Sequence, residues 1–196
     1  MKAIITTKYG SPEVLQLKDI EKPMPKKNEV LIHIRAASVT TADTMMRKGS
    51  PWVGRLFIGL TKPKNPISGT GFSGVIETIG QDVKQFQIGN EVFGESIFGT
   101  GTNAEYVCVK EDGVLVLKPE HIAHEEAAAI CDGPLTSWNF LKGMAKVKRG
   151  QSVLIHGASG SLGTAAVQLA KHLGANVTGV CSTKNMEMVT SLGAAT

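Results

Sequence analysis

A glycine-rich run between residues 157 and 163, GASGSLG, holds the residues whose types and spacing most clearly indicate chemistry. Before it, Val153–His156 is a short apolar run of the kind that is buried in parallel sheets. After it, residues 162–173 repeat apolar side chains at helical spacing, Asn176–Val180 reads as a second strand, and Asn185–Leu192 begins another helix. Strand, glycine loop, helix, strand and helix in this order are the start of a dinucleotide-binding fold.

This glycine loop has the spacing of a phosphate-binding motif. In the G-x-G-x-x-G frame, Ala158 takes the first position, Gly160 the second and Gly163 the third. The second glycine lets the backbone approach a pyrophosphate, and the third lets the helix pack closely on the strand. The N-terminus of the helix adds unpaired N–H groups and a partial positive charge. A purely structural strand-to-helix turn is the alternative, but the flanking strands and helix supply the context that the motif requires.

The end of the second predicted strand indicates which dinucleotide is bound. NAD-selective sites carry an Asp or Glu about 20 residues after the glycine run, where it bonds the ribose 2′-hydroxyl. This chain has no carboxylate in its Cys181–Lys184 segment. The hydroxyl of Ser182 and the ammonium of Lys184 suit a 2′-phosphate instead. We therefore predict NADPH over NADH, with a simply solvated Lys184 as the alternative.

Length, composition and charge define the class of protein. The 196 residues allow one large domain or two small ones, and 42% hydrophobic with 19% charged residues is enough to bury a core. The net charge of +4 is small and spread along the chain, which argues against nucleic-acid binding. Three cysteines without a CxxC pair fit a reducing compartment. No apolar run is long enough to cross a membrane and no signal peptide is recognisable, so we expect a cytoplasmic protein without a membrane partner.

The pattern of the chain changes near Pro119. Before this residue, Glu29–Ala37 alternates with period two, as a strand does. Other elements expected there are strands at Gly74–Gly80, Asn90–Gly94, Ala104–Lys110 and Val114–Leu117, and a short helix at Thr40–Lys48. Their spacing predicts an antiparallel, barrel-like or sandwich body. After Pro119, two helices are predicted at His124–Ile130 and Leu135–Lys146, near a kink at Gly133-Pro134.

Four segments distributed over both halves carry a resemblance to a known family. They are Gly69–Val75 followed by Gly80, Phe86 with Gly89–Gly94, Ala127–Leu141, and Val153–Lys171. The chain resembles the medium-chain dehydrogenase/reductase superfamily, in its zinc-free, quinone oxidoreductase-like branch (NADP-dependent alcohol dehydrogenase-like). The resemblance implies an α/β protein with a β-rich part. Residues 1–120 would form a GroES-like catalytic barrel and residues 121–196 the first part of an NAD(P)-binding Rossmann domain, with cofactor and substrate in the cleft between them.

This predicted Rossmann part is incomplete. From Val153 onward the chain supplies two strands and two helices of a fold built from about six strands. It stops at Gly193–Thr196, where the family continues into a third strand. We therefore expect a C-terminally truncated chain with an exposed sheet edge, a tendency to form a homo-oligomer, and poor or absent catalysis.

The resemblance also predicts that no zinc is bound. Zinc-dependent relatives place a Cys and a His where this chain has Thr40 and Thr70, and a Glu where it has Gly71. A thiolate or imidazole ligand is missing at the first two positions, and the cysteine quartet of the structural zinc lobe is absent too. Alcohol oxidation by a zinc mechanism is therefore not expected.

The activity that the resemblance implies is hydride transfer from NADPH to a small-molecule substrate, a quinone or an activated C=C or carbonyl compound. It places Thr40 near the nicotinamide, where the branch often has Asn, and Thr136 near the cofactor. The pyrophosphate loop matches Ser159, Gly160, Ser161 and Leu162. No residue stands out as a proton donor, and a quinone could take its protons from water. The alternatives are a catalytically weak nucleotide-binding or structural protein, and an acyl-chain enoyl reductase.

Five further side chains have structural interpretations. We expect Asp43 to make structural hydrogen bonds, Cys131 to pack at a helix end, and His156 to be buried in packing rather than near the cofactor. Trp52 and Phe57 could line an apolar substrate wall or pack in the core.

Overall fold

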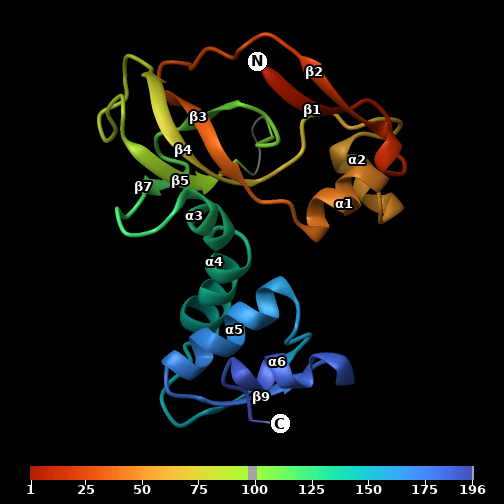
Figure 1. Cartoon of the computed structure of the whole chain (residues 1–196), viewed down its shortest axis with the longest axis vertical. Helices are drawn as coiled ribbons and strands as arrows, with labels where there is room; N and C mark the ends of the chain where they lie inside the picture. Colours follow the sequence, from red (N-terminus) through yellow and green to blue (C-terminus); the bar gives the residue numbers. More distant parts are fainter. Residues whose placement is uncertain (97–100, 196) are drawn as a thin grey trace. The chain divides into compact units, whose positions relative to one another are not determined.

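Strands β1 to β7 all precede residue 118, and after that residue helices alternate with one pair of strands. The computed structural model describes residues 1–96 and 101–195, and the chain divides into two compact units, Met1–Ala129 and Ile130–Thr196 (Figure 1). The molecule is an α/β protein with a β-rich first part, as predicted. Each unit is described by itself below.

The first unit is built on a five-stranded antiparallel sheet with the order β6-β3-β4-β5-β7. Its strands are β3 (Glu29–Ala37), β4 (Gly71–Ile79), β5 (Glu91–Glu95), β6 (Tyr106–Lys110) and β7 (Val114–Leu117). All five were predicted, β3 and β7 with the same bounds. Strand β4 begins at Gly71 rather than Gly74, because Gly71 pairs with Glu95 of β5 and Phe72 pairs with Ala37 of β3.

The core of this sheet follows the period-two pattern of its strands. Val30, Ile32, Phe72, Val92 and Val107 are completely buried in one hydrophobic cluster. Burying such branched and aromatic side chains contributes roughly 1.5–3 kcal/mol each. The pairing of β3 with β4 shifts register twice, and such irregularities bend a strand and increase its twist. The sheet is therefore curled, as the predicted barrel-like body requires.

An N-terminal hairpin, β1 (Lys2–Thr6) with β2 (Leu15–Asp19), was not predicted from the sequence. Every residue of β2 is exposed, so its alternation carries no burial signal. The hairpin is held by long-range pairing instead, since Ala3 bridges to Ala104 and Ile5 bridges to Ile67.

Short helices complete the first unit. They are α1 (Thr41–Lys48), α2 (Arg55–Ile58) and α3 (His124–Ile130), with 3-10 turns at Pro12–Val14 and Trp52–Gly54. Helix α3 has the predicted bounds, and α1 begins one position after its N-cap Thr40.

The second unit contains the parallel pair β8 (Ser152–His156) and β9 (Asn176–Val180), whose register runs from Ser152 opposite Asn176 to His156 opposite Val180. Helix α5 (Ser161–His172) connects the two strands, and α6 (Met186–Ser191) follows a 3-10 turn at Thr183–Asn185. The core joins residues of the strands and of α5, among them Ile155, Val167, Ala170 and Val177.

One predicted helix of the second unit differs in its form. Instead of one helix over Leu135–Lys146, the structure has α4 (Gly133–Trp138) followed by a π-helical segment, Asn139–Met144. The helical pattern ends because Lys146 adopts a left-handed conformation with φ of 51°.

After α6, the chain begins to pair with β9. Ala195 forms a parallel bridge with Thr178, and the Ala195 N–H donates to the Val177 carbonyl oxygen, so a third strand position begins beside β9.

A polar cluster fastens α3 to the sheet of the first unit. Lys118, with 5% of its side chain exposed, reaches Glu91 at 3.0 Å and also donates to the carbonyl oxygens of Pro119 and Ile122. His124 at the start of α3 lies 3.5 Å from Glu91 and 2.8 Å from the Ser73 hydroxyl. The hydrogen bond from Lys118 is the main reason that the pKa of Glu91 lies below its ordinary value.

This cluster predicts a pH-dependent contribution to stability. Because the pKa of Glu91 is lower in the folded state, the ionised carboxylate stabilises that state. This contribution to stability is fully present above the unfolded pKa of about 4.3 and is lost as the pH falls through the folded pKa. Urea unfolding of the wild type and of Glu91→Gln between pH 7 and pH 3 measures this. The stability difference should be largest near pH 7 and shrink in acid, and a difference that is constant with pH would contradict it.

Candidate functional site

The glycine loop folds back against the end of β9. The N–H groups of Gly157 and Ala158 both donate to the Val180 carbonyl oxygen at 3.0 Å. Gly157 has φ of 75°, a conformation that favours glycine, and Gly160 N–H donates to the Gly157 carbonyl oxygen at 3.0 Å. These bonds hold the loop in one tight turn between β8 and α5.

The two later glycines of the motif have different surroundings. A Cβ on Gly163 would lie 2.1 Å from the Gly157 carbonyl oxygen and 2.7 Å from Ala158 Cα, so α5 can approach the loop only with glycine there. A Cβ on Gly160 would meet only the Gly157 carbonyl oxygen, at 3.4 Å. The outer surface at Gly160 is therefore open to a ligand, while Gly163 serves the packing of helix on strand.

Helix α5 begins at this loop without a side-chain cap. Its N-cap is Gly160, which forms no capping hydrogen bond, and Ser161 and Leu162 in the first turn are exposed. The N–H groups of a helix N-terminus bind anions when no side chain satisfies them. The open backbone at Gly160 together with this helix end fits the pyrophosphate of a dinucleotide.

Asn185 connects the loop to the segment after β9. Its side-chain amide donates to the Ser159 hydroxyl at 3.0 Å and to the Ser182 hydroxyl at 3.2 Å. Two of the predicted site residues are thereby brought together, and Lys184 lies exposed in the adjacent 3-10 turn. Asn185 was not predicted as a site residue, because its sequence context indicated only the start of a helix.

Thr136 lies on α4, which packs against the start of α5. The Ser137 hydroxyl donates to the Leu162 carbonyl oxygen at 2.8 Å, and a Cβ on Gly133 would lie 2.7 Å from the Ser161 carbonyl oxygen. Thr136 itself is half-buried and lines a cavity of about 440 Å³ with Leu135, Trp138, Asn139, Lys142 and Gly143. The helix that carries Thr136 is thus fixed on the first turn of α5, next to the glycine loop.

His156 is exposed, so the prediction that it is buried in packing was wrong. It lies on the same face of β8 as Leu154, which is 69% exposed. Val153 and Ile155 on the other face pack into the core with α5. The expectation failed because short apolar runs are typical of strands that are buried on both faces, whereas only one face of β8 is covered.

Thr40 belongs to the first unit, where it forms a capping box with Asp43 at the start of α1. The Asp43 carboxylate accepts from the Thr40 backbone N–H at 2.8 Å and from the Gly69 N–H at 2.7 Å, and it is 7% exposed. The predicted structural hydrogen-bonding role of Asp43 is observed. Its carboxylate joins the start of α1 to the segment that leads into β4.

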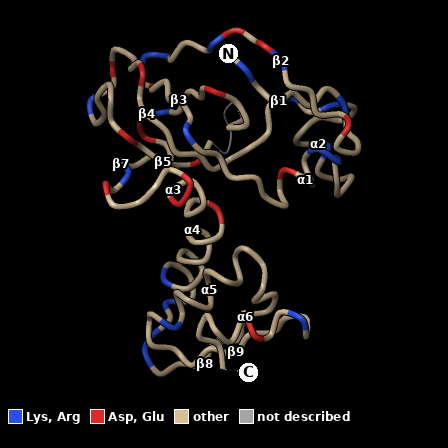
Figure 2. The backbone as a smooth tube through the Cα atoms, viewed as in Figure 1, with Lys and Arg blue, Asp and Glu red and all other residues tan. Residues whose placement is uncertain are grey.

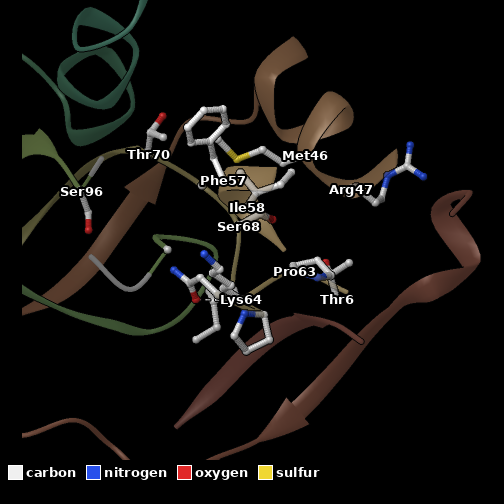
Figure 3. Close-up of a pocket in the computed structure, with 15 residues that line it drawn as sticks. Thr6, Met46, Arg47, Phe57, Ile58, Pro63, Lys64, Ser68, Thr70 and Ser96 are labelled. Carbon is white, nitrogen blue, oxygen red and sulfur yellow. Dashed lines mark hydrogen bonds between the residues drawn. The ribbon is translucent and has the colours of Figure 1, made fainter. Parts of the chain in front are cut away.

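A cavity of about 210 Å³ lies beside this segment (Figure 3). Phe57 and Met46 lie next to each other on its wall, and Thr70, Ser96 and Thr6 also line it. Phe57 is 77% exposed and Trp52 is 68% exposed, so neither packs in the core. Phe57 lines the cavity and Trp52 does not.

Charged side chains are distributed differently in the two units. Residues 130–195 carry six basic side chains, at positions 142, 146, 148, 149, 171 and 184, but only two acidic ones, Asp132 and Glu187, whereas both signs alternate along the first unit (Figure 2). Of these basic side chains, Lys184 lies in the turn that Asn185 joins to the glycine loop, whereas Arg149 and Lys171 lie beside Gly174 and Gly193. Among residues 1–96 and 101–195, no group of three His, Cys, Asp or Glu side chains could hold a metal ion, and no helix is long and apolar enough to span a membrane.

Comparisons with known proteins agree with this geometry. Residues 26–120 match the alcohol dehydrogenase GroES-like domain. The quinone oxidoreductase of Sus scrofa is 38% identical over 186 residues, which cover 94% of this chain and 54% of that protein. The solved quinone oxidoreductase of Coxiella burnetii has a TM-score of 0.89 and 36% identity, covering 99% of this chain and 60% of that one. The JamJ enoyl reductase (apo form) has a TM-score of 0.90 and 30% identity, covering 98% and 57%.

The fold, the glycine loop and these relatives together define the class of the protein. The chain belongs to the medium-chain dehydrogenase/reductase superfamily and is similar to its quinone oxidoreductases. It spans about half the length of the curated relatives it matches, 54% in the case of the Sus scrofa protein.

Removing the Asp43 carboxylate should destabilise the first unit. Asp43→Ala leaves the buried N–H of Gly69 and the N–H of Thr40 without their acceptor, and we expect the free energy of unfolding to fall by about 2–3 kcal/mol. Chemical denaturation measures this. Asp112→Ala at an exposed turn is the control and should change stability by less than about 0.5 kcal/mol. Equal effects of the two substitutions would contradict the role of Asp43.

The two glycines should respond differently to alanine. Gly163→Ala forces its Cβ against the loop backbone and should lower stability by about 1–3 kcal/mol. The Cβ of Gly160→Ala would make only an ordinary contact with the Gly157 carbonyl oxygen at 3.4 Å. Because Gly160 has φ of −82° and ψ of 173°, which alanine adopts readily, this variant should stay within about 1 kcal/mol of the wild type. Thermal unfolding of both variants tests this, and a larger loss for Gly160→Ala would show the structural assignment to be wrong.

Proposed function

We propose that this protein is a zinc-independent oxidoreductase that uses NADPH to reduce a quinone or an activated C=C or carbonyl compound. The observation that carries this proposal is the glycine loop joined through Asn185 to Ser182, with Lys184 in the adjoining turn. The quinone oxidoreductases and enoyl reductase among its relatives support the same class of reaction.

Residues of the second unit would hold the cofactor. The backbone N–H groups at the start of α5 would bind the pyrophosphate beside Ser159, Gly160, Ser161 and Leu162. Asn185 would position the Ser159 and Ser182 hydroxyls, because it donates to both. Thr136 from α4, and Thr40 from the first unit, would lie near the nicotinamide. The bound cofactor supplies the hydride, and these side chains bind and orient it.

The preference for NADPH rests on charge. The segment from Cys181 to Lys184 offers hydroxyls and one ammonium group but no carboxylate to bond a ribose 2′-hydroxyl. A 2′-phosphate carries extra negative charge, and a charge-assisted hydrogen bond from Lys184 would favour it. Ser182 and Lys184 are both exposed, so they can reach a ligand without displacing core residues.

Residues of the first unit support a reaction that does not use zinc. Thr40, Thr70 and Gly71 stand where zinc-dependent relatives place their ligands, and none of the three offers a thiolate or an imidazole. A quinone needs no metal to hold a developing alkoxide, and it can take its protons from water. Reduction of an enoyl group would differ only in the substrate. Self-association and a cytoplasmic location remain predictions.

Cofactor titration followed by fluorescence tests the proposal. We expect this chain to bind NADPH more tightly than NADH, and Lys184→Ala to weaken NADPH binding roughly tenfold while NADH changes less than about twofold. Lys148→Ala, at an exposed lysine of the same unit, is the matched control.

Gly160→Ala should fold normally but bind both cofactors more weakly, because its Cβ would occupy the surface open to the pyrophosphate.

Turnover is measured separately, as NADPH consumption with 1,4-benzoquinone before and after treatment with EDTA. Activity that survives EDTA supports the zinc-independent reductase. Tight NADPH binding without consumption of any quinone would instead favour a nucleotide-binding protein that lacks a working active site. A clear preference for NADH would contradict the assignment of Ser182 and Lys184.

A further inference from the structure

The segment 52–60 of the first unit carries its large apolar side chains on the side that faces solvent. It consists of the 3-10 turn Trp52–Gly54, helix α2 and the two residues that follow. Five of its residues are more than half exposed, namely Trp52 (68%), Val53 (60%), Leu56 (57%), Phe57 (77%) and Leu60 (61%). Their spacing of one, three, one and three positions places them along one face of a helical segment, so they form one outward apolar face.

The opposite side of this segment is fixed to the rest of the first unit by polar contacts. The Arg55 guanidinium lies over the Tyr9 ring, 4.5 Å from its centre, and Arg55 Nε donates to the Gly49 carbonyl oxygen at 2.9 Å. The Tyr9 hydroxyl donates to the carbonyl oxygen of Gly59, which is buried. Because the segment is held by its polar side, the fold itself turns the apolar side outward.

Basic residues flank this apolar face. Residues 44–76 contain no Asp or Glu, and the basic residues among them are Arg47, Lys48, Arg55, Lys62 and Lys64 (Figure 2). The three lysines are exposed. None of the ion pairs formed within residues 1–96 and 101–195 involves one of them. A partner that complements this surface is therefore both apolar and negatively charged.

An anionic lipid bilayer has both properties. Exposed apolar patches of this kind mark contacts with proteins or membranes. Tryptophan and other amphipathic rings settle at the level of the lipid headgroups, and lysines beside them are attracted to anionic lipids. A second copy docked by the same face would place lysines opposite lysines, since a two-fold interface brings like patches together. The charge of the surface thus favours the bilayer over a second copy.

We propose that the outward face of segment 52–60 is a membrane-contact surface, with Trp52, Leu56 and Leu60 inserted at the headgroup boundary and Lys48 and Lys62 on the anionic headgroups. Such a contact lies on the bilayer surface and needs no spanning helix, so it departs from the sequence-based expectation of a protein without a membrane partner. It goes beyond the proposed reductase function and does not depend on cofactor binding or hydride transfer.

Flotation of the full chain with lipid vesicles tests this surface. The vesicles contain phosphatidylcholine alone, or phosphatidylcholine and phosphatidylserine at a ratio of about 7:3, and the chain should partition at least about tenfold more strongly onto the second kind. Replacing both leucines, Leu56→Ser with Leu60→Ser, should weaken partitioning onto the mixed vesicles about tenfold or more. Lys62→Gln should weaken it about fivefold, and high salt should weaken binding of the wild type.

The connection between β4 and β5 in the same unit supplies matched controls. Ile88 is 64% exposed, close to the value for Leu60, and Lys84 is an exposed lysine. Ile88→Ser and Lys84→Gln should each leave partitioning within about twofold of the wild type. Neither leucine of segment 52–60 lines the cavity of Figure 3, and all substituted residues are exposed, so thermal unfolding should show every variant to be folded.

Three results would overturn the proposal. The first is failure of the wild type to float with the mixed vesicles, or equal binding to both kinds. The second is an equal loss of binding in the control variants. The third is a dimer in sedimentation velocity that the double leucine variant converts to a monomer without any vesicle binding, because the face would then take a second copy of the chain.

Discussion

The buried carboxylate of Asp43 is the interaction on which the first unit depends. One oxygen accepts from the Thr40 N–H at the start of α1, and the other accepts from the Gly69 N–H just before β4. Segments that lie far apart in the sequence are thereby fixed to each other by one side chain. The same carboxylate thus fixes Thr40 and Gly69, the residue before Thr70. Helix α1, whose first turn contains Asp43, also lines the cavity beside Gly69.

In the second unit a close approach of backbones has the corresponding role. Gly163 allows α5 to lie against the carbonyl oxygen of Gly157, and Gly133 allows α4 to lie against Ser161. Both approaches place helix N-termini next to the loop without a side chain between them. The surroundings of the two neighbouring glycines of the motif are therefore opposite in kind. Gly163 contacts the loop backbone closely, whereas Gly160 leaves open space beside it.

Each unit carries a part of the chemistry. The second unit has the glycine loop, a surplus of basic side chains and the hydroxyls that Asn185 joins. The first offers an apolar cavity with a single unpaired hydroxyl. Polar and charged groups thus gather in the second unit, whereas the largest apolar side chains of the cavity wall lie in the first.

The sequence by itself determined the elements whose signal is local. Period-two alternation gave β3 its bounds, and the glycine spacing between an apolar strand and an amphipathic helix located the loop. The hairpin of β1 and β2, the exposure of His156, the bond of Asn185 to Ser159, and the unpaired Thr6 hydroxyl were decided by the tertiary structure. The physical reason is that local patterns depend on which face of an element is apolar. Pairing, burial and hydrogen bonds between distant residues depend instead on what packs against that face, and no short stretch of sequence contains that information.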